Sequence, residues 1–221
     1  MANKNSNKKL ICFDLDGTII DKTNNIWISI CEGLGADKER KQVGSKKFFS
    51  KLITYDQWIE HDVMLWKEKG VTRQRIIDII KNLKLMEGTE ETLNELKKKG
   101  FKIGVISDSL DIVLEVLLPN YKEIFDDVFI NKLFFNEKGE IIGWKATKYA
   151  MEMKGNGLKR IAEKEGISLA DCIFVGDGSN DINAARLAGF SIAFNSDCEE
   201  LKRVCNVVIE KKDLREILRY V

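Results

Sequence analysis

The feature that most constrains the fold of this chain is a short apolar run that ends in two acidic residues. Leu10-Ile-Cys-Phe13 leads directly into Asp14-Leu-Asp-Gly-Thr18. A short apolar run before a glycine turn is typical of a buried strand, and open α/β sheets bind ligands at the carboxyl ends of such strands. Because side chains alternate along a strand, Asp14 and Asp16 should point to the same face. Two acids with no nearby base favour a metal, and Mg²⁺ prefers oxygen ligands; a solvated acidic turn is the simpler alternative.

From residue 89 onward the chain alternates between helical and strand-like segments. Together with the first run, the predicted strands are 9–13, 101–106, 128–130, 172–175, 190–194 and 207–209. The predicted helices are 89–99, 110–118, 155–165, 182–188, 199–204 and 214–218. Residues 134–142 contain a glycine turn between apolar pairs and predict a β-hairpin. Repeated strand–helix units indicate an α/β fold with a doubly wound parallel sheet that is covered by helices on both faces.

The segment from residue 24 to residue 85 has a different pattern. Its apolar residues recur at helical spacing, and it shows no clear strand. A helical block of this length between two strands predicts a small cap that is inserted into the α/β unit. We therefore expect a core domain made of residues 1–22 and 86–221 and a cap domain made of residues 23–85. Residues 1–8 are polar and predict a disordered tail.

Composition and charge argue against several classes of protein. Lys and Arg number 36 and Asp and Glu 35, so the formal net charge of +1 gives no pull toward nucleic acid or an anionic membrane. No apolar stretch approaches the length of a membrane span, and no signal-peptide pattern follows the polar start. The five cysteines include no Cys-x-x-Cys pair, which favours reduced thiols. We expect a cytoplasmic protein, monomeric or homodimeric.

Four groups of polar residues lie where the predicted strands end or their helices begin. They are the pair Asp14 and Asp16, then Ser107, Lys154, and the pair Asp177 and Asp181. Parallel strands place all four groups at one edge of the sheet. Each alone has a plain explanation, since a strand-end serine is usually a turn residue and a helix-flanking lysine is usually solvated. Together they describe a phosphoryl-transfer site, in which carboxylates hold Mg²⁺, a lysine and a hydroxyl neutralise phosphate oxygens, and one carboxylate attacks.

This combination resembles the haloacid dehalogenase superfamily of aspartate-nucleophile phosphatases. Asp14-Leu-Asp-Gly-Thr18 is similar to its first motif, Ser107 to the second, Lys154 to the third and Gly176-Asp-Gly-Ser-Asn-Asp181 to the fourth. The order and spacing match over nearly the whole chain. Within the superfamily, the carboxyl-terminal half is most similar to the phosphoserine phosphatase subfamily, and a helical cap and a hairpin at these positions fit that subgroup. The resemblance implies a Mg²⁺-dependent phosphomonoesterase for a small phosphorylated metabolite, which in that subfamily is O-phosphoserine.

The resemblance also implies a role for each residue of the site. Asp14 would attack phosphorus, form an aspartyl-phosphate and bind Mg²⁺ through its other oxygen. Asp16 would act as general acid and then as general base, and its backbone carbonyl would bind the metal. Asp177 would be a direct metal ligand, and Asp181 would support either the metal site or the lysine. The phosphate and substrate contacts would come from Thr18, Ser107, Asp108, Lys154 and Asn180, with Lys159 as the competing lysine.

Three positions depart from the phosphoserine phosphatase pattern. Thr23 stands where a glutamate usually recognises the amino group of the substrate. Residues 60–62, Glu-His-Asp, stand around the position of a cap arginine that usually pairs with the substrate carboxylate, and an acid there would repel it. The second motif continues with Asp108-Ser109 in place of two glycines. Arginines elsewhere in the cap could compensate, namely Arg40, Arg73 or Arg75.

These departures keep other functions open. The alternatives are a related phosphatase for a sugar phosphate or a nucleotide, a phosphate-binding regulator without turnover, and a phosphotransferase to an alcohol. Trp27, Trp58 and Trp66 are most simply core residues of the cap, although one of them could face the site and shape a pocket for a ring-bearing substrate. His61, the single histidine, is expected on the cap and not in catalysis.

Overall fold

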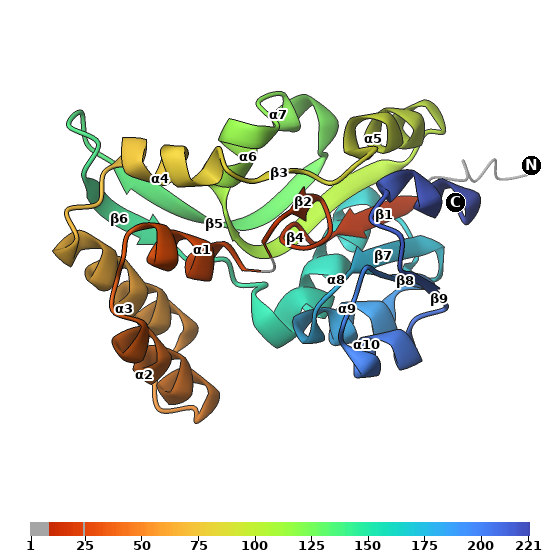
Figure 1. Cartoon of the computed structure of the whole chain (residues 1–221). Coiled ribbons are helices and arrows are strands. Elements are labelled where there is room, and N and C mark those ends of the chain that lie inside the picture. Colours follow the sequence, from red (N-terminus) through yellow and green to blue (C-terminus); the bar gives the residue numbers. More distant parts are fainter. Residues whose placement is uncertain (1–8, 24) are drawn as a thin grey trace, which may run out of the picture.

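The chain is built around a seven-stranded sheet (Figure 1). The computed structural model describes residues 9–23 and 25–221, so the predicted tail at 1–8 lies outside the described residues. The strands lie in the order β6-β5-β4-β1-β7-β8-β9, and all pairs are parallel except β5 with β6. Their bounds are Leu10–Phe13 (β1), Lys102–Leu110 (β4), Asp127–Phe135 (β5), Ile141–Lys145 (β6), Cys172–Gly176 (β7), Phe190–Phe194 (β8) and Val207–Ile209 (β9). The predicted α/β fold with a doubly wound, mostly parallel sheet is confirmed.

Helices cover both faces of this sheet. They are α5 (Thr89–Lys98), α6 (Asp111–Leu117), α7 (Tyr121–Ile124), α8 (Lys154–Glu165), α9 (Ile182–Leu187) and α10 (Glu199–Val204), followed by a 3₁₀ helix at Leu214–Arg219. Figure 1 shows α5 to α7 on one side of the sheet and α8 to α10 on the other. In β1, Leu10 and Cys12 belong to the apolar cluster of α8 to α10, whereas Ile11 and Phe13 belong to that of α5 and α6. All four side chains are fully buried, as expected for a central parallel strand.

Four helices occupy the segment that the sequence predicts to be a cap. They are α1 (Ile26–Gly33), α2 (Lys38–Phe49), α3 (Tyr55–Glu68) and α4 (Arg73–Ile80). Each follows a side chain that accepts a backbone N–H of the first turn, namely Asn25, Asp37, Thr54 and Thr72. The prediction that this segment contains no strand is wrong at the end of the segment, where β3 (Lys84–Leu85) pairs with β2 (Ile20–Asp21). A strand of two residues is too short to show an alternating pattern in the sequence. The division into a core domain and a cap domain stays a prediction.

The predicted strand at 128–130 and the first strand of the predicted hairpin form one continuous strand, β5. β5 pairs with β4 over its first part and with β6 over its last part. The turn between β5 and β6 contains Gly139, whose φ is +77°. Its carbonyl accepts a hydrogen bond of 2.7 Å from the backbone N–H of Arg73 in α4. The hairpin therefore contacts the helical segment.

Membrane-spanning helices and disulfides are absent from the described residues. No helix in 9–23 and 25–221 is both long and apolar enough to cross a membrane. All five cysteines lie in these residues, and each of them is free. The cytoplasmic location and the oligomeric state stay predictions.

Candidate active site

A fully buried lysine lies among the acidic residues that the sequence singles out. Lys154, the first residue of α8, has its Nζ 2.8 Å from Asp14 Oδ2 and 2.7 Å from Asp181 Oδ1. Burial opposes the charging of this ammonium, but the two carboxylates outweigh burial and hold the pKa of Lys154 well above its usual value. Lys159 is exposed on α8. Of the two candidate lysines, Lys154 is therefore the one that contacts the acids.

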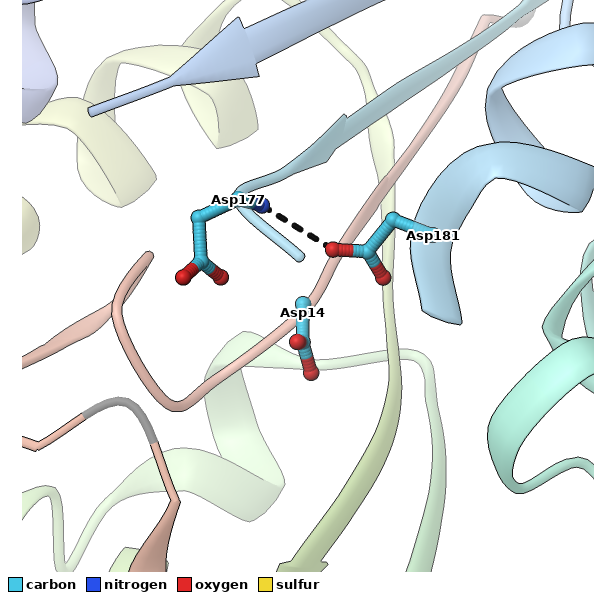
Figure 2. A group of neighbouring side chains, drawn as sticks. All are labelled: Asp14, Asp177 and Asp181. Carbon is cyan, nitrogen blue, oxygen red and sulfur yellow. Dashed lines mark hydrogen bonds between the residues drawn. The ribbon is translucent and has the colours of Figure 1, made fainter. Parts of the chain in front are cut away.

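Three carboxylates, from Asp14, Asp177 and Asp181, converge on one point (Figure 2). One oxygen of each lies within 4.8 Å of the other two. Both oxygens of Asp181 are already engaged, since Oδ1 bonds to Lys154 and Oδ2 accepts the backbone N–H groups of Asp177 (2.9 Å) and Gly178 (3.0 Å). Asp181 therefore holds its neighbours in place. Asp14 also accepts at both oxygens, from the backbone N–H of Leu15 at Oδ1 (2.7 Å) and from Lys154 at Oδ2, but each of its oxygens keeps a further acceptor position. Among the described residues, Asp177 Oδ2 has no hydrogen-bond donor, so it is the oxygen most open to a metal.

The glycine of the first motif, Gly17, allows the Asp177 carboxylate to lie against the backbone of that motif. Gly17 has a φ of +82°, and a Cβ at this position would lie 2.2 Å from Asp177 Oδ2. Glycine is therefore required both for the left-handed backbone and for the close contact. Thr18 is fully buried, and its Oγ1 donates a hydrogen bond of 3.2 Å to Asp177 Oδ1. The first motif thus fixes the orientation of a carboxylate that lies far away in the sequence.

The cluster carries an excess of negative charge that a cation would balance. Burial, Asp14 and Asp181 together raise the pKa of Asp177, and burial with Asp14 raises the pKa of Asp181 against the effect of Lys154. The groups that converge here are carboxylates, whose oxygens are the ligands that Mg²⁺ prefers. The residues present therefore fit a divalent cation held by Asp14 and Asp177.

Asp16 is oriented by two hydrogen bonds. Its Oδ1 accepts from Ser109 Oγ (2.8 Å), and its Oδ2 accepts from the backbone N–H of Ile26 (2.7 Å). Burial and repulsion from Asp14 nevertheless raise the pKa of Asp16 to about 7, a value that suits a group that both releases and takes up a proton near neutral pH. The sequence gives no role to Ser109. Its position two residues after Ser107 in β4, and hence on the same face of the strand, is the signal that would have identified it.

Two neighbouring cavities open over these residues. The small cavity, of about 50 Å³, is lined by Asp14, Asp16, Ser107 and Asp177 among others. The large cavity, of about 650 Å³, is lined mainly by α1, α2 and α3, and by the loop after β7. Five residues line both cavities, namely Asn25, Trp27, Asp108, Gly178 and Asn180. This arrangement suits a phosphate in the small cavity and the rest of a substrate in the large one.

Asp108 connects several segments where the two cavities meet. Its Oδ1 accepts the backbone N–H of Met151 (2.8 Å), and its Oδ2 accepts Nδ2 of Asn180 (2.9 Å). Its backbone carbonyl accepts Nε1 of Trp27 (2.8 Å) and Nδ2 of Asn131 (2.7 Å). The structure thus brings together Asp108 and Asn180, both predicted as substrate contacts.

The wall of the large cavity is aromatic and contains paired charges. Trp27, Tyr55 and Trp58 line it, whereas Trp66 is fully buried and stacks on Trp27 with ring centroids 5.0 Å apart. Trp27 and Trp58 therefore contribute to the cavity wall, while Trp27 also belongs to the buried apolar core together with Trp66. Two ion pairs also line the cavity, Lys38 with Glu32 and Lys41 with Asp62.

Several residues singled out in the sequence do not line either cavity. Thr18 contacts Asp177, so its role as a phosphate contact stays a prediction. Thr23 is buried, and its Oγ1 bonds to Ser29 Oγ (2.8 Å) and to the backbone N–H of Asn25 (3.1 Å). The three arginines that could compensate in the cap form hydrogen bonds away from the cavities. Arg40 donates to Glu68, Arg73 donates to Glu115, and Arg75 donates to the backbone carbonyl of Lys69. Asn25, which the sequence does not single out, lies at the junction of the cavities because it caps α1.

Known proteins are similar to this chain in sequence and in fold. The sequence model of haloacid dehalogenase-like hydrolases matches residues 8–189. A phosphoserine phosphatase from Methanocaldococcus jannaschii is 36% identical over 217 residues, which cover 97% of this chain and 98% of the relative. Two solved structures, a phospho-aspartyl intermediate analogue of phosphoserine phosphatase and a substrate-bound phosphoserine phosphatase complex, are each 32% identical with a TM-score of 0.75. Each covers 97% of this chain, and the chain covers 99% and 98% of them respectively.

The chain belongs to the haloacid dehalogenase-like hydrolases. It is a phosphoric monoester hydrolase of the kind that the phosphoserine phosphatases represent. The resemblance seen in the sequence and the enzymatic class inferred from it are confirmed.

Proposed function

We propose that the protein is a Mg²⁺-dependent phosphomonoesterase that hydrolyses O-phosphoserine through an aspartyl-phosphate on Asp14. The observation that carries this proposal is that Asp14 and Asp16 line one small cavity, while the buried Lys154 contacts the Asp14 carboxylate. The relatives named as phosphoserine phosphatases support the substrate. The protein acts in the cytoplasm on a small metabolite, without nucleic acid or membrane.

The reaction takes place in two halves. A carboxylate oxygen of Asp14 attacks phosphorus, and the bond from phosphorus to the ester oxygen breaks while Asp16 donates its proton to the leaving alkoxide. Asp16 then takes a proton from water, the water oxygen attacks phosphorus, and the bond to Asp14 breaks to release phosphate. Lys154 and Ser107 stabilise the charge on the phosphate oxygens in both halves.

Asp14 and Asp177 would hold the Mg²⁺, and the backbone carbonyl of Asp16 is a further predicted ligand. When bound, the ion supplies the positive charge that stabilises the phosphate oxygens as bonds change. Asp181 keeps the backbone of Asp177 in position through its N–H, and Gly17 leaves the room that the Asp177 carboxylate needs.

Release of inorganic phosphate from O-phosphoserine, with and without Mg²⁺, tests the proposal. Asp14→Asn keeps the side-chain size but removes the nucleophile, so we expect kcat to fall by about 10³-fold or more. Asp171→Asn changes an exposed aspartate outside the site and is the matched control. Wild-type turnover by Asp14→Asn would refute the role of Asp14, as would failure to trap a phosphorylated or BeF₃⁻-bound wild-type protein.

The large cavity favours a second candidate, a phosphatase for a larger, ring-bearing phosphoester. Its volume of about 650 Å³ lies within the range of pockets that bury drug-sized ligands, and Trp27, Tyr55 and Trp58 supply flat apolar walls. Comparison of O-phosphoserine with phosphorylated sugars, nucleotides and aryl phosphates separates the two candidates. A kcat/KM for O-phosphoserine more than about tenfold above all the others would eliminate the second candidate.

A further inference from the structure

We propose that the Asp108 carboxylate is a specificity-determining residue, which selects phosphomonoesters whose leaving group carries an ammonium close to the ester oxygen. This inference rests on the proposed phosphatase function. It assigns the preference for an amino alcohol phosphate to a position in the second motif, where the sequence departs from the family pattern.

The first support is the position of Asp108 between the two cavities. Its side chain is partly exposed and lines both the small cavity with Asp14, Asp16 and Ser107 and the large cavity beyond it. A phosphate bound beside Asp14 would place the first atoms of the leaving group at this junction. Asp108 is thus positioned to contact the substrate within a few bonds of phosphorus.

The second support is the balance of charge around the large cavity. Three carboxylates line it, from Glu32, Asp62 and Asp108. The first two are paired with Lys38 and Lys41. Among the described residues, no basic nitrogen lies within 4.0 Å of the Asp108 carboxylate. Asp108 is therefore the carboxylate of this wall whose charge lacks a counter-ion within contact distance, and a substrate cation would supply one.

The third support is the number of hydrogen bonds that Asp108 makes. A carboxylate has about four acceptor positions on its two oxygens. The backbone N–H of Met151 and the side-chain amide of Asn180 occupy one on each oxygen, and both donors are neutral. These bonds fix the orientation of the carboxylate but leave its charge and further acceptor positions available to an ammonium.

The surroundings of Asp108 also suit a cation. Trp27 donates its Nε1 to the Asp108 carbonyl, so this indole is held beside the carboxylate at the junction of the cavities. Tyr55 and Trp58 line the adjoining wall, and aromatic faces attract ammonium groups. Thr23, which stands where related enzymes usually carry a glutamate, has its hydroxyl engaged and does not line either cavity.

A matched pair of substrates measures the effect of the ammonium. O-phosphoethanolamine and ethyl phosphate differ only in the amino group, so the ratio of their kcat/KM values isolates its contribution. We expect this ratio to fall by about 10- to 100-fold from wild type to Asp108→Asn, which keeps the shape of the side chain but loses its charge. Asp111→Asn is the matched control. Asp111, at the start of α6, likewise accepts two neutral N–H donors, both from the backbone, but does not line either cavity.

The outcomes distinguish this inference from the function on which it rests. If Asp108 only braces Asn180 and Met151, Asp108→Asn will lower kcat/KM for both substrates equally, and the inference is overturned. If the wild type hydrolyses neither of these compounds nor O-phosphoserine, the proposed function fails. The preference for an ammonium is then measured as the ratio of the Kd values of the same two compounds, determined by calorimetry with the Mg²⁺-loaded protein. Equal affinities of wild type for the two compounds would also overturn the inference.

Discussion

At the scale of single residues, the arrangement of the acids depends on the Lys154 ammonium. It is fully buried and contacts Asp14 and Asp181. Removal of one partner of a buried ion pair leaves an uncompensated charge, which typically costs about 3–5 kcal/mol. We therefore expect Lys154→Met to lower the free energy of unfolding of the metal-free protein by about 3–5 kcal/mol, measured by urea denaturation, and to lose phosphatase activity.

Lys159→Met is the matched control for this prediction. Lys159 is exposed on the same helix, so its replacement should change stability by less than about 0.5 kcal/mol. Mg²⁺ should restore part of the stability that Lys154→Met loses, because the ion supplies positive charge to the same carboxylates. Equal losses in the two variants, or no effect of Mg²⁺, would contradict the assigned role of Lys154.

The sequence predicts the reactive residues better than the residues that orient them. Asp14, Lys154 and Asp177 follow from the rule that parallel strands end at one edge of a sheet, and the structure does bring them together. The contact of Thr18 with Asp177 is not predictable in this way, and the spacing that places Ser109 on the same face as Ser107 does not identify Asp16 as its partner. Such hydroxyl bonds depend on the path of each loop in space, which spacing in a sequence does not specify.

At the scale of elements, the 3₁₀ helix at 214–219 is held against α5 by a network of charges. Arg215 contacts Asp213 (2.8 Å), Glu87 (2.9 Å) and Glu91 (3.0 Å). Hydrogen bonding to Arg215 holds the pKa of Asp213 well below its usual value. A carboxyl whose pKa is lower in the folded state stabilises the fold above its unfolded pKa, and this contribution disappears as the pH falls through the folded pKa.

This linkage gives a prediction for Asp213→Asn. We expect the variant to melt about 2–4 °C below wild type at pH 7, because the charged contact with Arg215 is lost. The gap should narrow as the pH falls below about 4, where the unfolded wild-type carboxyl takes up its proton and the contribution begins to be lost. Melting curves recorded between pH 7 and pH 2 measure this difference in Tm between wild type and Asp213→Asn. Glu210→Gln, which changes an exposed carboxylate, is the control. A gap that is constant with pH would contradict the linkage.

Elements with a strong pattern are predictable from the sequence, and short or merged elements are not. The strands at 10–13 and 172–176 appear as apolar runs because both faces of the sheet are covered. β2 and β3 have two residues each, and their pairing depends on a contact between distant parts of the chain. The sequence predicts two separate segments where β5 is continuous. The first half of β5 pairs with β4 and the second half with β6, and this change of neighbour follows only from the assembled sheet.

At the scale of the whole molecule, one apolar cluster runs from the sheet into the helical segment. It contains Phe13 and Val105 from the strands together with Trp27, Trp66 and Ile76 from α1, α3 and α4. The large cavity is likewise lined by both parts of the chain. A ligand that binds at the site therefore contacts both parts and should stabilise the molecule as one unit.

Thermal unfolding with a phosphate analogue tests this expectation. A ligand at about 100 times its Kd stabilises the folded state by about 2.7 kcal/mol, which corresponds to a rise in Tm of about 5–10 °C for a chain of this size. We expect this rise with Mg²⁺ and BeF₃⁻ together, and its loss when EDTA removes the metal. Asp14→Asn should show no rise. A rise with BeF₃⁻ in EDTA would mean that the analogue binds without the metal.

The central place of β1 in the sheet has a consequence for biosynthesis. Leu10 pairs with Lys102 on one side and with Cys172 on the other, so both neighbours of this early strand are made much later. Pairing over such long stretches of chain is slow, because the entropy of closing a large loop is lost before any contact forms. We therefore expect Leu10–Phe13 of a growing polypeptide to be exposed to solvent, and to chaperones that bind apolar segments, until Cys172–Gly176 has left the ribosome.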